Sequence, residues 1–201
     1  MSVCPTRRRL ERQLPFSGIL SAHRSLEMHP MVVSPTLTAA ASAYLVTGPR
    51  LLMAKGALSE MAAQLTPHCP ESARLLIPDM LELAEVYSAV SGHRNLRVRL
   101  EKITTDSCRK FHVDCVDLRL LRAYVGPGVQ WTADEGQTVQ EAPTGAVVFL
   151  KGKHFPGWDE AEKILHRSPP LSFRPVPERV RLLLTIDEAN ACGDAAFDMV
   201  A

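Results

Sequence analysis

The chain has 201 residues, 46% of them hydrophobic, and a formal net charge of +1. This size fits one domain with an ample core, with or without a helical or irregular N-terminal extension. The near-neutral charge gives no reason to expect nucleic-acid binding, and no stretch reaches the roughly 20 apolar residues that cross a bilayer. Five cysteines without a CxxC pair indicate reduced thiols, and we expect a cytoplasmic protein that binds neither nucleic acid nor membranes.

The first half of the chain predicts helices after an irregular start. Residues 1–50 carry scattered Pro and Ser with no sustained period, so we expect them to be poorly ordered or irregular. Apolar residues recur at helical spacing over 51–65 and again over 71–91. Pro78 should kink or split the second helix, and Gly92 should end it. Residues 51–92 are therefore expected to form a helical region that supports the C-terminal half of the chain.

After Gly92 the apolar period changes from 3.6 residues to 2. Residues 96–103 alternate apolar and charged side chains, which predicts a half-buried strand. Four further strands are expected, over residues 117–125, 129–132, 146–150 and 179–186. Helices followed by short strands with Gly/Pro turns favour the α+β class, with N-terminal helices packed on a C-terminal jelly roll. We expect this β-barrel domain to span 93–190, followed by a tail over 191–201.

Two histidines and one aspartate form the most informative pattern. Side chains two residues apart on an extended segment leave the same face, so His112 and Asp114 can converge on one ion. His166 lies just ahead of the last strongly apolar segment and supplies a third ligand. Two imidazoles and one carboxylate leave open positions on octahedral Fe(II), as in non-haem oxygenases. The alternative for His112 and Asp114 is a structural hydrogen bond in a turn.

Two cysteines near His112 raise a zinc alternative. Cys108, His112 and Cys115 are spaced as a Cys-x3-His-x2-Cys cluster, and thiolates favour zinc over iron. On an extended segment only Cys108 shares the face of His112 and Asp114, so only Cys108 joins the three ligands without a bend.

The residues around this pattern resemble the prolyl-hydroxylase-like 2-oxoglutarate dioxygenases. The run from His112 to Asp114, followed by Arg119 and Tyr124, is similar to the first metal-binding strand of that family. The resemblance implies catalytic or supporting roles for Arg119 and Tyr124. From the sequence alone, Arg119 could fix the Asp117 carboxylate, bind an acidic substrate or form an exposed ion pair. The ordinary alternative for Tyr124 is the more frequent one, a ring packed in the core with its hydroxyl at the rim.

The C-terminal part carries the same resemblance. His166 is similar to the distal histidine of those dioxygenases, and Arg181 to the arginine that holds the far carboxylate of 2-oxoglutarate. Arg179 competes with Arg181, because both fall on one face of the expected last strand. The alternative is that both arginines face solvent on an edge strand.

A closer resemblance, over residues 93–187, is to an uncharacterised bacterial family, a domain of unknown function. It implies a cupin-like double-stranded β-helix that binds a metal, and a genomic neighbourhood shared with zinc-homeostasis GTPases, one of which would be a partner. The matching motifs are Lys-Phe-His-Val-Asp (110–114), Leu-Arg-Leu-Leu (118–121), Tyr-Val-Gly-Pro-Gly (124–128), His-Arg-Ser-Pro-Pro (166–170) and Arg-Leu-Leu-Leu-Thr-Ile-Asp (181–187).

The leading hypothesis is an Fe(II)-dependent oxygenase-like metalloprotein with His112, Asp114 and His166 as ligands. Whether it uses 2-oxoglutarate is left open, and its substrate is an unidentified small molecule or protein side chain. One alternative is a non-catalytic cupin-like protein that binds zinc for metal homeostasis. A second is a metal-free interaction domain that keeps the barrel.

Overall fold

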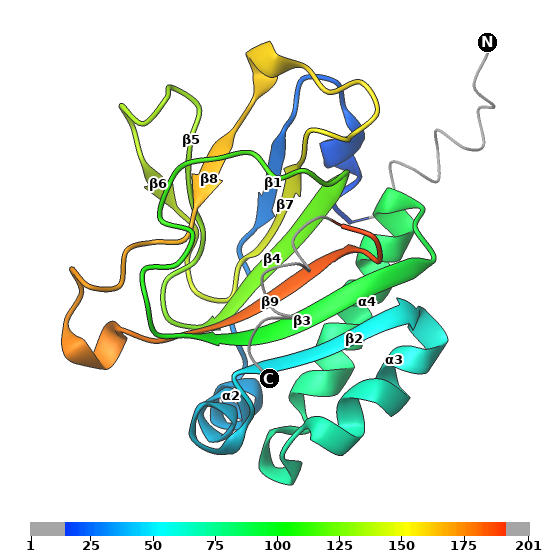
Figure 1. Ribbon diagram of the computed structural model, residues 1–201, viewed down its shortest axis with the longest axis vertical. Helices are drawn as coiled ribbons and strands as arrows, with labels where there is room; N and C mark the ends of the chain where they lie inside the picture. The colour runs from blue at the N-terminus through cyan, green and yellow to red at the C-terminus, as the bar shows by residue number, and fades with distance from the viewer. Residues whose placement is uncertain (1–14, 192–201) are drawn as a thin grey trace.

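The computed structural model describes residues 15–191, which form two antiparallel β-sheets and a set of helices (Figure 1). The larger sheet has six strands in the order β1-β7-β4-β9-β3-β2, and the smaller has three in the order β6-β5-β8. The larger sheet comprises β1 (Leu26–His29), β2 (Leu51–Ala57), β3 (Asn95–Ile103), β4 (Leu118–Val125), β7 (Val147–Lys151) and β9 (Arg181–Glu188). The smaller comprises β5 (Gln130–Thr132), β6 (Gln140–Glu141) and β8 (Leu165–Arg167).

Helices alternate with strands in the first half of the chain. The α-helices are α2 (Pro35–Thr47), α3 (Leu58–Leu65) and α4 (Leu76–Ser91). Short 3-10 turns are η1 (Ser17–Leu20), η2 (Thr66–His68), η3 (Glu71–Ala73), η4 (Glu160–Glu162) and η5 (Val176–Glu178). No helix within residues 15–191 has the length and apolar character needed to cross a membrane.

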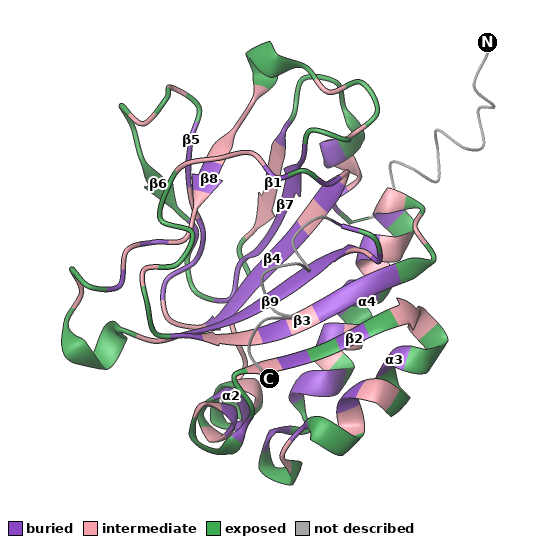
Figure 2. Cartoon of the chain, in the orientation of Figure 1, coloured by how far each residue is buried: buried purple, intermediate pink, exposed green. Residues whose placement is uncertain are grey.

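The central strands β4, β7 and β9 of the large sheet are almost entirely buried, whereas the edge strands β1 and β2 are partly exposed (Figure 2). Alternate residues of a strand point to opposite faces, and β9 shows the consequence. Leu182, Leu184 and Ile186 pack with the helices, whereas Leu183 packs in a second cluster with Trp131 of the small sheet. The molecule therefore has three layers: helices, large sheet and small sheet. The second apolar cluster lies between the two sheets, and this is where a site can form.

The expected helix over residues 51–65 is wrong in its first half, which is strand β2. Leu52 and Ala54 are buried while Met53 and Lys55 are exposed, which is the period of a strand. β2 pairs antiparallel with β3 along its whole length, from Leu51 to Ala57. Pairing with a long neighbouring strand outweighs the local helical spacing. Only residues 58–65 are helical, as α3.

Residues 15–50 contain regular structure, contrary to the expected irregular segment, and residues 1–14 lie outside the described part. β1 pairs with β7 at one edge of the large sheet. Helix α2 begins at Pro35, with the Ser34 hydroxyl accepting a hydrogen bond from the Leu37 amide, and buries Tyr44 completely. The large sheet thus includes β1 and β2, two strands that lie outside the expected 93–190 region. The expected tail lies outside the described residues from 192 onward.

The second helix follows the prediction more closely. The 3-10 turn η3 precedes α4, so the segment is split upstream of Pro78. Pro78 then occupies the first turn of α4, where its missing N–H has no helical partner to lose. Gly92 ends α4 with φ of 79°, a conformation that favours glycine. The strands expected after Gly92 are present, although the last begins at Arg181 instead of Arg179.

Candidate metal centre

Main-chain pairing brings the two histidines together. The amide of His112 donates to the His166 carbonyl at 3.0 Å, and the His166 amide donates back at 2.9 Å. This isolated antiparallel bridge extends the small sheet beyond β8. Directly opposed residues of an antiparallel pair project to the same face, and the two ring centroids are 4.6 Å apart.

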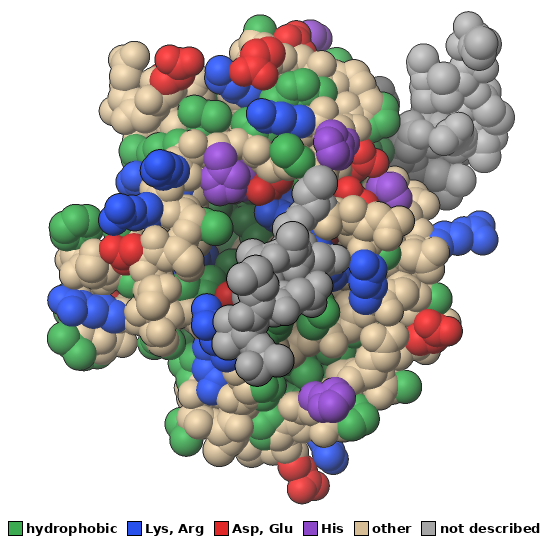
Figure 3. All heavy atoms as spheres, in the orientation of Figure 1, with side chains coloured by type: hydrophobic (Ala, Val, Ile, Leu, Met, Phe, Trp, Pro, Cys, Tyr) green, Lys and Arg blue, Asp and Glu red, His purple; other side chains and the backbone are tan. Residues whose placement is uncertain are grey.

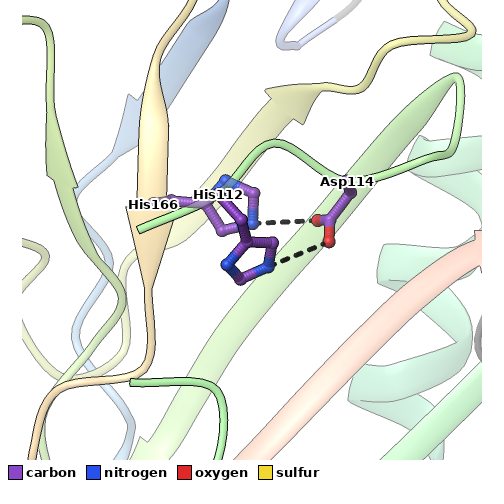
Figure 4. A group of neighbouring side chains, drawn as sticks. All are labelled: His112, Asp114 and His166. Atoms are coloured by element: carbon purple, nitrogen blue, oxygen red, sulfur yellow. Dashed lines mark ion pairs between the residues drawn. The ribbon is translucent and has the colours of Figure 1, made fainter. Parts of the chain in front are cut away.

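Asp114 completes the group from the loop that leads into β4. His166 Nε2 lies 2.9 Å from Asp114 Oδ2, and His112 Nε2 lies 3.3 Å from Oδ1 (Figure 4). One ligating atom from each of the three residues falls within 4.8 Å of the others. Ligand atoms at right angles on an octahedral ion, each about 2.1 Å from it, are about 3 Å apart. The two histidine–carboxylate distances are close to this spacing, so the three residues form a candidate site for a common metal ion.

A buried arginine fixes the carboxylate of Asp114. Arg119 on β4 donates from Nη1 to Asp114 Oδ1 at 2.6 Å. Its Nε donates to Asp187 Oδ1, also at 2.6 Å, and its Nη2 reaches Asp187 Oδ2 at 3.2 Å. Asp187 is fully buried on β9 and receives further hydrogen bonds from Arg97 and Arg99 on β3. The ligand carboxylate is thus anchored to three strands of the large sheet.

This surrounding keeps Asp114 ionised, as a metal ligand must be. Burial by itself would raise the pKa of Asp114, but the rings of His112 and His166 and the Arg119 guanidinium outweigh it and hold the pKa well below its usual range. The hydrogen bond with Asp114 in turn raises the pKa of His112. Asp114 is therefore an anion at neutral pH.

Two buried polar atoms of the group lack hydrogen bonds. Among the described residues, nothing donates to Asp114 Oδ2 with hydrogen-bond geometry, although His166 Nε2 is only 2.9 Å away. The Nδ1 of His166 is likewise buried without a partner in the described part of the chain. Buried polar atoms are almost always satisfied by protein, water or an ion. The donor set of two imidazoles and one carboxylate suits Fe(II), so these residues fit that metal.

His112, Asp114 and His166 line a cavity of about 430 Å³ between the sheets. Figure 3 shows the molecule hollowed on this face, with histidine and charged side chains around the hollow. Leu121, Val129 and Leu183 form an apolar part of its wall, and Cys108 and Cys115 also line it. The cysteines do not belong to the group of ligating atoms that the described residues form.

Arg181 lines the same cavity and is almost completely buried. Its Nε donates to the Pro127 carbonyl at 2.7 Å, and its Nη1 to the Ser168 hydroxyl at 2.9 Å. Within residues 15–191, no carboxylate lies within 4.0 Å of this guanidinium. Burial lowers the pKa of Arg181 to about 10, so the side chain remains a cation at neutral pH. A buried cation without a counter-ion is suited to an anionic ligand.

Two other predicted site residues lie away from the cavity. Arg179 is exposed at the end of η5, before β9 begins, and donates to the Arg174 carbonyl. Tyr124 is buried on the helical side of the large sheet, where its hydroxyl donates to Asp79 of α4. The structure therefore places neither Tyr124 nor Arg179 beside the group of His112, Asp114 and His166. Arg122 pairs with the same Asp79, so this group joins helix to sheet.

The predicted partner of Arg119 also differs. Asp117, expected beside Arg119, pairs instead with His93 at 2.9 Å. Arg119 instead holds Asp114 and Asp187, and Asp187 had no role in the sequence-based prediction. The sequence could have indicated this position for Asp187. Asp187 lies an even number of residues from Arg181 along β9, so both side chains project from the same face of the sheet.

A family model described as "Protein of unknown function (DUF1826)" matches residues 18–187. The chain belongs to the DUF1826 family. No curated protein matches the sequence.

Solved structures provide distant similarities to this DUF1826 protein. A Pseudomonas putida prolyl-4-hydroxylase is 12% identical, with a TM-score of 0.45 over 81% of this chain and 91% of that one. The viral collagen prolyl hydroxylase of Paramecium bursaria Chlorella virus-1, solved with 2-oxoglutarate, is 9% identical, with a TM-score of 0.44 over 82% and 96%. The Arabidopsis thaliana dioxygenase for auxin oxidation 1, also solved with 2-oxoglutarate, is 11% identical, with a TM-score of 0.42 over 92% and 76%. At these scores the function has to rest on the geometry of the site.

Proposed function

We propose that this DUF1826 protein is a non-haem Fe(II)-dependent oxygenase that uses a 2-oxo acid such as 2-oxoglutarate. One observation carries the proposal. His112, Asp114 and His166 have ligating atoms within 4.8 Å of one another, and they line the same cavity as the buried Arg181, which has no carboxylate partner within residues 15–191. A metal-ligand set and a separate carboxylate-binding cation are the two parts that such chemistry needs from the protein.

Fe(II) held by three protein ligands supplies open coordination positions for a co-substrate and dioxygen. The chain's own residues bind and orient what reacts there. Arg181 presents a planar guanidinium that pairs with a carboxylate through two parallel hydrogen bonds. Arg119 holds the Asp114 carboxylate in place. The apolar wall of Leu121, Val129 and Leu183 excludes water from one side of the cavity.

The order of the strands supports a double-stranded β-helix as the scaffold. From β3 onward, the chain alternates between the two sheets: β3 in the large, the His112 bridge in the small, β4 in the large, β5 and β6 in the small, then β7, β8 and β9 in turn. Such alternation between facing antiparallel sheets is typical of jelly rolls and cupins. Ligands from β8 and from the segment between β3 and β4 then meet inside.

Metal binding tests the first half of the proposal. Anaerobically reconstituted protein should bind about one Fe(II), and His112→Ala and His166→Ala should each abolish stoichiometric binding. His154→Ala is the matched control, because His154 is exposed and outside the ligand group. Full stoichiometric iron binding by both His112→Ala and His166→Ala would refute the proposed centre.

Co-substrate binding tests the second half. Arg181→Gln should weaken 2-oxoglutarate binding to the iron-loaded protein by roughly 10- to 100-fold, because hydrogen bonds to a charged group contribute about 1.5–3 kcal/mol. Arg179→Gln is the matched control and should leave the affinity unchanged, since Arg179 lies outside the cavity. Calorimetry measures both affinities, and 2-oxoglutarate-dependent succinate release reports turnover. Equal effects of the two substitutions would argue against Arg181 as the co-substrate residue.

The zinc-binding alternative receives no specific support. Cys108 and Cys115 lie outside the ligand group that the described residues form, so no thiolate is in place to favour zinc over iron. A metal-homeostasis GTPase as partner stays a prediction from the family resemblance.

A further inference from the structure

The main chain of Asp114 is held by residues outside the proposed ligand group. The regular pairing of β4 with β7 ends at Leu118 and Lys151. Beyond this point, the three consecutive amides of residues 152–154 donate to carbonyls of the segment that precedes β4. The second of these amides, that of Lys153, donates to the Asp114 carbonyl at 2.9 Å. The chain that follows β7 therefore holds the segment that carries the proposed ligand.

The two flanking hydrogen bonds show that this pairing is irregular. The Gly152 amide donates to the Asp117 carbonyl at 2.8 Å, and the His154 amide donates to the Val116 carbonyl at 3.1 Å. In a regular antiparallel ladder only alternate residues donate to the same neighbouring strand, so donation by consecutive amides marks a departure from the ladder. Asp114 thus lies outside the regular part of the large sheet, and Figure 4 shows its carboxylate facing the two histidines.

Gly152 is the residue that permits this close approach. It is buried, and its φ lies outside the left-handed region, so its backbone conformation alone does not call for glycine. A Cβ built on Gly152 would overlap the Val116 carbonyl oxygen and would lie 2.8 Å from the Asp114 carbonyl oxygen, whereas ordinary contacts of a Cβ begin at 3.4 Å. Both obstructing atoms belong to the main chain, so no side-chain rotation relieves the overlap.

A side chain at position 152 would therefore displace the Asp114 segment or the turn that holds it. An ordinary contact with the Asp114 carbonyl requires a shift of roughly half an ångström, whereas metal–ligand distances fall within about 0.2 Å of their usual values. The Asp114 carboxylate is tied separately to Arg119. Because the main chain would move while Arg119 still holds the side chain, the carboxylate would change its position relative to the two histidines.

We propose that the turn of residues 152–155 positions Asp114 for metal binding, through the small size of Gly152 and the amide of Lys153. The turn is closed by the Phe155 amide, which donates to the Gly152 carbonyl at 3.1 Å. The role in metal binding rests on the proposed function, whereas the main-chain contacts do not. Gly152 and Lys153 are thus positioning residues, because they act on the metal through Asp114.

Gly152→Ala tests this role in the full-length protein. Anaerobic titration measures the Fe(II) affinity, and circular dichroism shows whether the variant folds. The affinity should fall roughly 10- to 100-fold, as it does when other groups that hold a ligand are removed. Gly128→Ala is the matched control. Gly128 is also buried with a φ outside the left-handed region, but a Cβ there would overlap the Ala142 carbonyl oxygen, which is not part of the ligand segment. This control should lower the free energy of unfolding and leave the iron affinity unchanged.

Lys153→Pro is a second test, which decides the question if Gly152→Ala does not fold. Lys153 is the second residue of a four-residue turn and has a φ outside the left-handed region, and proline is favoured at this position of such turns. Proline lacks the amide hydrogen that the Asp114 carbonyl accepts, so the Fe(II) affinity should fall roughly 10-fold. Lys153→Ala keeps the amide and changes only an exposed side chain, so it should bind iron as the wild type does.

The positioning role is overturned if folded Gly152→Ala binds iron as tightly as Gly128→Ala. Should Gly152→Ala not fold, equal iron affinities of Lys153→Pro and Lys153→Ala overturn it. Iron binding that is lost in His166→Ala but intact in these variants would refute the positioning role alone. Failure of the wild type to bind iron would instead overturn the proposed metal centre, and the positioning role with it.

Discussion

At the scale of single residues, the proposed metal ligand Asp114 is held in place by a series of charged side chains. Asp114 is oriented by Arg119, and Arg119 is oriented by the fully buried Asp187. Both carboxylates are tied to the same guanidinium, which leaves Asp114 Oδ2 facing His166. Outer partners that hold a ligating carboxylate commonly affect metal affinity by 10- to 100-fold. Arg119 is in this sense a positioning residue.

Arg119→Gln should therefore weaken both metal binding and folding. Removing one partner of a buried ion pair leaves an uncompensated charge, which costs roughly 3–5 kcal/mol of unfolding free energy. Fe(II) affinity should fall about 10- to 100-fold, and Arg119→Lys should recover part of it. Anaerobic iron titration and denaturant unfolding measure the two effects. A purely structural arginine would lower the stability while leaving the iron affinity of the folded protein unchanged.

The sequence identified the proposed ligands more accurately than it identified the residues around them. His112, Asp114 and His166 do come together. The i,i+2 spacing of His112 and Asp114 is a local feature that the sequence shows, whereas the main-chain bridge from His112 to His166 joins distant segments and was not predicted. The proposed role of Tyr124 beside Arg119 was wrong, and the residue numbers could have shown it. The two residues are five positions apart, and a regular strand puts residues at an odd separation on opposite faces. Arg179 could not be separated from Arg181 without knowing that η5 delays the start of β9.

At the scale of elements, the ends of β4 and β9 meet at Gly126. Its φ is +78°, and a Cβ placed there would lie 2.2 Å from the Val180 carbonyl and 3.0 Å from Arg181 Cγ. The next residue, Pro127, supplies the carbonyl that accepts from Arg181. This turn therefore sets the position of the proposed co-substrate arginine.

Gly126→Ala should destabilise the protein by roughly 3–5 kcal/mol and weaken 2-oxoglutarate binding, because both the backbone conformation and the contact with Val180 are violated. Gly157→Ala is the matched control. Gly157 also has a positive φ, of +81°, but a Cβ there meets nothing within 4 Å. It should cost only the conformational penalty of roughly 1–3 kcal/mol. Chemical denaturation compares the free energies of unfolding of the two variants. Equal losses of unfolding free energy would show that the protein avoids the Val180 contact without any energetic cost.

Elements at the sheet edges were the hardest to predict from sequence. The apolar residues of 51–65 match a helix period by count, yet β2 forms because β3 offers an unpaired edge along seven residues. β1 has four half-buried residues and no clear alternation, so only its pairing with β7 defines it. The central strands were predictable for two reasons. β3 alternates apolar and charged residues, whereas β7 and β9 carry apolar runs, as expected of strands covered on both faces.

At the scale of the whole molecule, the proposed metal centre lies between the two sheets and contacts both. His112 and His166 belong to the small sheet, whereas Asp114 leads into β4 and is held by Arg119 in the large one. Main-chain hydrogen bonds join strands within each sheet, while the contacts between the sheets are apolar packing together with this charged group. An ion bound here would link the small sheet to the large sheet only in the folded state.

Iron should therefore raise the thermal stability of the entire fold. A ligand that binds only the native state stabilises it by about 2.7 kcal/mol at 100 times its dissociation constant. For a chain of 150–250 residues, each kcal/mol raises the Tm by about 2–4 °C, so a shift of roughly 5–10 °C is expected. Anaerobic thermal unfolding with Fe(II), and again after chelation, measures it. His166→Ala should abolish the shift and His154→Ala should keep it. A Tm shift of equal size in wild type and His166→Ala would mean that iron binds elsewhere on the molecule. Its stabilising effect would then not come from the proposed site between the two sheets.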